Sequence, residues 1–98
     1  MKTLEERRSV NAGGEFAIRL EATPTAGYTW QLTDSPAELE QIGSGYEPIA
    51  DTTRMGGTRT QVFRFLALTP GSYTLTFDLK RQNDADVTTR QRVRVSVR

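Results

Sequence analysis

Residues 73–80 read Tyr-Thr-Leu-Thr-Phe-Asp-Leu-Lys, with an apolar or aromatic residue at every odd position and a polar one at every even position. Successive side chains of a β-strand point to opposite faces of the sheet, so this alternation predicts one buried and one solvated face. Aromatic residues and threonine also suit a pleated, half-buried surface. This stretch is therefore the clearest strand signal in the chain.

The same period of two recurs on both sides of that stretch. It covers four further runs, at residues 15–21, 28–32, 63–67 and 93–97. Turn-forming residues separate the runs, at 11–14, 23–27, 55–57, 70–71 and 82–84. Residues 35–43 compete as a short helical turn, and we interpret them as a turn leading into a short strand. About seven short strands of this kind predict an all-β, immunoglobulin-like antiparallel β-sandwich.

The length and composition bound the classes of function. The 98 residues make one domain, 1–98, in which we expect residues 1–8 to be loosely ordered. The chain has no Cys and no His, which removes disulfides, a thiolate nucleophile, an imidazole base and the usual zinc ligands. We therefore expect no enzyme activity, no metal and no cofactor. The net charge of +1 offers no strong field for nucleic acid.

The targeting signals of the sequence are weak. No apolar run approaches the roughly 18 residues that a membrane span needs, so we expect no membrane partner. The first ten residues lack the apolar core of a signal peptide. As written, the chain is expected in the cytoplasm, and it would be periplasmic or secreted if a leader had been removed before Met1.

The segment 23–30, Thr-Pro-Thr-Ala-Gly-Tyr-Thr-Trp, is the most informative connection. Pro24 fixes φ and Gly27 permits a positive φ, so the connection is shaped in advance. Tyr28 and Trp30 share one side of the strand that follows, and we expect both to point into the core. From the residues alone, a tight strand connection with an aromatic plug explains this composition better than a functional loop does.

Residues 23–28 resemble the signature loop Asn-Pro-Thr-Thr-Gly-Tyr/Phe of the chagasin-like inhibitors of papain-family cysteine proteases. Pro24, Thr25, Gly27 and Tyr28 match, whereas Thr23 and Ala26 differ. The family's Gly-x-Gly-Gly loop is matched in part by Arg54, Met55, Gly56 and Gly57. Its Arg-Pro-Trp/Phe loop keeps only Arg81, since Gln82 and Asn83 replace the proline and the aromatic residue. The resemblance extends over about residues 9–97.

This resemblance implies a sandwich whose three loops enter the cleft of a papain-like cysteine protease, with reversible, non-covalent inhibition. The charged last strand favours a monomer. Thr23, Pro24, Thr25, Ala26 and Gly27 would form the central plug over the catalytic cysteine. The segments 54–57 and 81–83 would contact the cleft on either side. Tyr28 and Trp30 would support the plug from the core rather than touch the protease.

Two other interpretations stay open at this point. The altered Gln82 and Asn83 allow a binding or assembly module of the same fold whose inhibitory loops have decayed. Arginines on one face of the last strand allow a stripe for phosphates or an acidic partner. A solvated outer face explains the arginines better, since the net charge is small and no aromatic residues lie between them. The residues of this face are Arg90, Arg92, Arg94 and Arg98, with Lys80 or Arg64 beside them.

Overall fold

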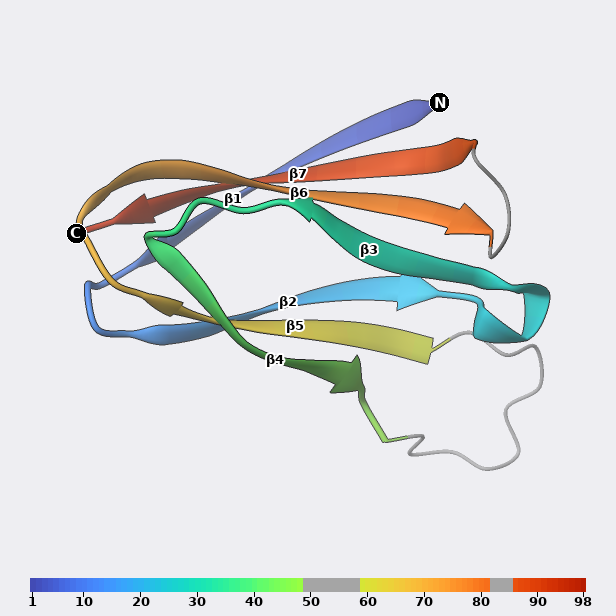
Figure 1. Cartoon of the computed structure of the whole chain (residues 1–98), viewed down its shortest axis with the longest axis horizontal. Coiled ribbons are helices and arrows are strands. Elements are labelled where there is room, and N and C mark those ends of the chain that lie inside the picture. The colour runs from blue at the N-terminus through green and yellow to red at the C-terminus, as the bar shows by residue number, and fades with distance from the viewer. Residues whose placement is uncertain (49–58, 82–85) are drawn as a thin grey trace.

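The computed structural model describes residues 1–48, 59–81 and 86–98 (Figure 1). This part of the chain is built from strands and one 3₁₀ turn, and it contains no helix long and apolar enough to cross a membrane. The elements are β1 (Lys2–Val10), β2 (Glu15–Ala22), η1 (Pro24–Ala26), β3 (Tyr28–Asp34), β4 (Leu39–Tyr46), β5 (Arg59–Ala67), β6 (Gly71–Arg81) and β7 (Val87–Val97).

The strands form two sheets, which Figure 1 shows as two layers. One sheet has the order β1-β7-β6-β3 and the other the order β2-β5-β4. The pairs β4–β5 and β6–β7 are antiparallel neighbours in sequence. The chain changes sheet at each of the other connections, between β1 and β2, β2 and β3, β3 and β4, and β5 and β6. The predicted β-sandwich is thereby confirmed. The segment 35–43 is also a turn followed by a strand, as predicted, with the Leu39 N–H donating to Pro36 O at 3.1 Å.

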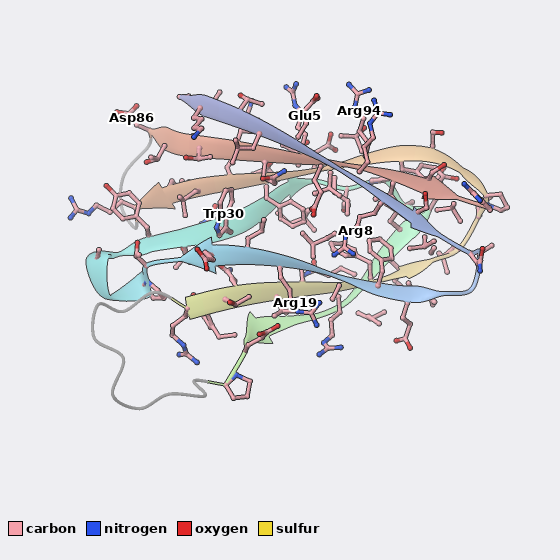
Figure 2. All side chains as sticks on the ribbon, turned by 180° about the vertical axis from the view of Figure 1, so that it is seen from behind. Glu5, Arg8, Arg19, Trp30, Asp86 and Arg94 are labelled. Atoms are coloured by element: carbon pink, nitrogen blue, oxygen red, sulfur yellow. The ribbon has the colours of Figure 1, made fainter. Side chains whose placement is uncertain are left out.

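Two details of the prediction are wrong. Residues 1–8 are not loosely ordered, because Lys2–Val10 form β1, and the sandwich is not wholly antiparallel, because β1 runs parallel to β7. β1 is an edge strand with mostly exposed side chains, so it carries no alternating pattern. Its order comes from the backbone ladder to β7 and from Arg8, which donates to Ala17 O of the other sheet at 2.7 Å (Figure 2).

The core lies between the sheets and consists of the alternating residues found in the sequence. Phe65, Leu75, Phe77 and Val93 have no exposed surface, and Ile18 is equally buried. The Phe77 ring lies 4.8 Å from that of Phe63 and 6.4 Å from that of Phe65, measured between centroids. Side chains of both sheets therefore interlock, and burial of these apolar surfaces is the main stabilising contribution.

One end of the sandwich gathers the features relevant to function. β2, β4 and β6 end there, and β3, β5 and β7 begin there. In the registers, Ala22 of β2 lies opposite Arg59, and Tyr28 of β3 lies opposite Arg81. Figure 1 shows η1 at this same end. We call it the loop end, and the central loop is residues 23–28.

Candidate functional site

The central loop closes on itself through backbone hydrogen bonds. Thr23 O accepts from Ala26 N at 3.0 Å and from Tyr28 N at 3.1 Å, and Pro24 O accepts from Gly27 N at 2.9 Å. Pro24 occupies the start of the 3₁₀ turn, where its fixed φ suits the turn and its missing N–H costs nothing. The loop is therefore shaped by its own backbone before any partner arrives.

Gly27 ends the 3₁₀ turn in the left-handed region, with φ +86°. Residues with a Cβ rarely adopt this conformation, so the chain needs glycine here. A Cβ built on Gly27 would lie 3.4 Å from Cγ of Arg81. The side chain of Arg81 thus lies beside the position that a side chain at residue 27 would take.

Arg81, the last residue of β6, contacts the central loop. Its Nε donates to Ala26 O at 3.3 Å, and its guanidinium lies over the Tyr28 ring at 5.4 Å from the centroid. A cation over an aromatic face adds attraction to the hydrogen bond. The family resemblance places Arg81 on the protease side, and the structure shows that it also braces the central loop.

Trp30 anchors the start of β3 between the sheets, as predicted. It is buried, and its indole Nε1 donates to Glu21 O of β2 at 2.8 Å (Figure 2). Tyr28 departs from the prediction, since it is only half-buried and has Arg81 over its ring. It is the first residue of β3 and lies next to the central loop.

Gln61 is a supporting residue that was not predicted from the sequence. Its side-chain amide pairs with the backbone of Trp30 in two hydrogen bonds of 2.9 Å, accepting from Trp30 N and donating to Trp30 O. The amide thereby fills the free edge of β3 from β5 of the opposite sheet. A polar residue in the inward-facing row that continues with Phe63 and Phe65 was the available signal.

The second predicted loop segment lies outside the described residues, since Arg54, Met55, Gly56 and Gly57 fall between Pro48 and Arg59. Its two flanks are described, and they are braced like the central loop. The Arg59 guanidinium lies 4.9 Å from the Tyr46 ring centroid and donates to Glu47 O at 3.3 Å. The Glu47 carboxylate in turn forms an ion pair with Arg19 of β2. This pairing was not predicted from the sequence, because the residues meet only through the sheet register.

The third predicted segment is described in part. Arg81 is the last residue of β6, whereas Gln82 and Asn83 lie outside the described residues. A shallow hollow of about 340 Å³ lies beside the central loop. It is lined by Pro24, Gly27, Thr29, Gln31, Lys80 and Arg81. The described part of the loop end therefore consists of a closed central loop with a hollow beside it, and Lys80 and Arg81 make the lining of that hollow basic.

Solved structures of similar shape share this architecture. A cysteine protease inhibitor from Entamoeba histolytica, EhICP2, superposes with a TM-score of 0.79 at 14% identity over 99% of this chain and 95% of that chain. Amebosin gives a TM-score of 0.70 at 19% identity, over 99% and 97% of the two chains. PbICP-C, solved in complex with falcipain-2, gives 0.65 at 16% identity, over 99% and 90%. At such low identities these likenesses establish the fold.

The sequence itself matches one family. No curated protein matches the chain in sequence. The model of the family described as Chagasin family peptidase inhibitor I42 matches residues 9–97, which is nearly the whole chain. The braced central loop lies within that match, and the family consists of inhibitors rather than enzymes. The chain thus belongs to the chagasin family of peptidase inhibitors.

Proposed function

We propose that this protein is a reversible inhibitor of papain-like cysteine proteases and that its loop end enters the active-site cleft. Membership of the chagasin family supports this function. The structural neighbours also support it, since one is a cysteine protease inhibitor and another was solved bound to falcipain-2. The single observation that carries the proposal is the central loop, which is closed by its own backbone and braced by Arg81 of β6.

The central loop is suited to the role of a plug because it is ordered before binding. Association costs free energy for every loop that must be fixed, and a loop already held in one shape avoids most of that cost. In the proposed complex Thr23, Pro24, Thr25, Ala26 and Gly27 lie over the catalytic cysteine. Small residues in a 3₁₀ turn present no extended scissile peptide, so the plug occupies the site without becoming a substrate.

The flanking segments would widen the contact on either side. Gly56 and Gly57 allow a close approach of backbone to backbone, which suits pairing with an extended cleft wall. The Nε of Arg81 donates to Ala26 O. The other guanidinium nitrogens can contact a carboxylate or an aromatic ring of the protease. Gln82 and Asn83 would contribute polar contacts where other members of the family carry an aromatic residue.

The experiment is a titration of papain with this protein, with a fluorogenic substrate and at two salt concentrations. We expect competitive inhibition that changes little with salt, because the contact is made mainly by backbone and uncharged side chains. Absence of inhibition up to tens of micromolar, with the protein shown to be folded by circular dichroism, would overturn the proposal. That result would favour a non-inhibitory binding module of the same fold.

A further inference from the structure

A second hollow, of about 470 Å³, lies on the outer face of the β1-β7-β6 sheet, far from the loop end. Two rows of side chains cross it in register. Ser9, Ser96 and Ser72 form one row, and Arg7, Arg94 and Thr74 form the next. Thr74 lies seven residues before Arg81 on β6, which corresponds to about 23 Å along the strand. Nothing in the proposed inhibitory mechanism uses this face.

The charges of this face are unevenly compensated. Arg90 is neutralised by Asp78, with Nε and Nη2 donating to the two carboxylate oxygens at 2.8 and 3.1 Å, and this hydrogen bond together with the charge of Asp78 raises the pKa of Arg90. Arg94 forms a weaker ion pair, in which Nη2 donates to Glu5 Oε1 at 3.4 Å and both side chains are more than half exposed. Among the described residues no carboxylate pairs with Arg7.

Arg7 and Arg94 are direct partners across the β1–β7 ladder (Figure 2 shows Arg94 and Glu5 on this outer face). Like charges at paired positions of neighbouring strands repel each other and destabilise the sheet. Arg92, which lies opposite Glu5, is a third cation on the same face. The hydroxyl groups of the serine row and of Thr74 lie next to this excess of positive charge. The face therefore combines guanidinium forks with hydroxyl donors around a hollow whose lining also includes Arg8, Tyr73 and Val95.

We propose that this hollow binds a tetrahedral oxyanion, a sulfate or phosphate group of a small ligand. Arg7 and Arg94 would donate to the oxyanion from two strands, and hydroxyls of the serine row would donate from one side. Guanidinium groups suit such oxygens because two parallel N–H groups match two oxygens of the anion. Binding would also relieve the repulsion between the two arginines. Since the hollow and the central loop lie at different ends, a bound anion would leave inhibition unchanged.

The test is an NMR titration of amide shifts at constant ionic strength, with sodium chloride replaced stepwise by sulfate or by phosphate. We expect saturable shifts centred on Ser9, Ser72, Thr74 and Ser96. Arg94→Gln and Arg7→Gln should each raise the dissociation constant about 10-fold, which is the effect of losing one hydrogen bond to a charged group. Arg64→Gln is the matched control, an exposed arginine on the opposite sheet, and it should bind as wild type does.

Phenyl phosphate and phenyl sulfate distinguish the source of the oxyanion. Tighter binding of the esters than of the inorganic ions would show that the hollow takes the group on a larger ligand, and equal binding would assign it to the free ion. Shifts that do not saturate would overturn the proposal. So would a loss of affinity in Arg64→Gln as large as the loss in Arg7→Gln and Arg94→Gln. Papain inhibition measured with and without sulfate is independent of this result, so the failure of one proposal leaves the other testable.

A thermal shift gives a second readout. In chloride alone, Arg7→Gln should melt at a higher temperature than wild type, because the substitution removes the repulsion with Arg94. Sulfate stabilises folded proteins in general, so it should raise both melting temperatures, but it should raise that of wild type more than that of Arg7→Gln because only wild type keeps the full site. An equal rise in both proteins would contradict an anion site at these arginines.

Discussion

Two glycines at opposite ends of the sandwich have nearly the same φ angle and different surroundings. Gly13, in the β1–β2 connection, has φ +84°, and a Cβ added there would meet nothing within 4 Å. Gly27 has φ +86°, and a Cβ added there would meet the side chain of Arg81 at 3.4 Å. Gly13 serves only a turn, whereas Gly27 lies in a loop that a neighbouring strand holds in place. The comparison separates the needs of the fold from the needs of the proposed plug.

The largest expected effect comes from placing the same side chain at both glycines. Gly27→Glu should weaken papain inhibition by more than about 100-fold, because the carboxylate displaces Arg81 and enters the protease contact. Gly13→Glu should inhibit as wild type does. Both substitutions impose similar backbone strain, about 1–3 kcal/mol, so their melting temperatures should fall together. Equal inhibition by the two variants would show that the central loop is not the plug.

A smaller effect is expected where the sheets are joined beneath the loop. Gln61→Met removes both hydrogen bonds to the Trp30 backbone, and it should lower the free energy of unfolding by about 2 kcal/mol. Gln41→Met, at an exposed position of β4, is the control and should change it by less than about 0.5 kcal/mol. Urea denaturation measures both. If Gln61→Met were as stable as the control, the amide bridge would not hold β3 in place.

The arginine brace is expected to matter more for inhibition than for stability. Arg81→Met keeps the aliphatic stem against Gly27 and removes the bond to Ala26 O and the cation over Tyr28. We expect the inhibition constant to rise about 10-fold. The free energy of unfolding should fall by less than about 1 kcal/mol, because Arg81 is exposed. Arg64→Met serves as the exposed control. An inhibition constant unchanged in Arg81→Met would contradict the bracing role.

The smallest effect on inhibition should come from the end away from the loops. Tyr73 donates its hydroxyl to Thr69 O and Pro70 O, each at 3.0 Å, and so closes the turn before β6. Tyr73→Phe should cost about 1 kcal/mol of unfolding free energy and leave papain inhibition unchanged. Denaturation and the inhibition assay, run on the same sample, check both parts. A loss of inhibition here would mean that the two ends of the sandwich are coupled.

Local sequence pattern predicted most of the fold for a physical reason. A strand with one buried face must alternate, so the runs around Phe65 and Phe77 were readable from the sequence. β1 was not, because an edge strand with two solvated faces carries no such pattern and depends on its partner β7. The charges of β1 suit this position, since charged edges oppose pairing with a second sheet.

The candidate site was predictable only in its local part. The Pro24–Gly27 turn follows from residues next to one another in the chain, whereas Gln61, Arg59 and the bracing by Arg81 depend on sheet register. Such register is not visible in one sequence. The roles assigned to Arg54, Met55, Gly56, Gly57, Gln82 and Asn83 stay predictions.

The most direct test of the central claim is whether the loop covers the catalytic cysteine of the protease. The rate at which iodoacetate alkylates the papain thiol can be measured with a saturating amount of this protein present. We predict strong protection by the wild type and by Gly13→Glu, and none by Gly27→Glu. Inhibition of substrate cleavage with an unchanged alkylation rate would contradict the account, because the plug would then not lie over the cysteine.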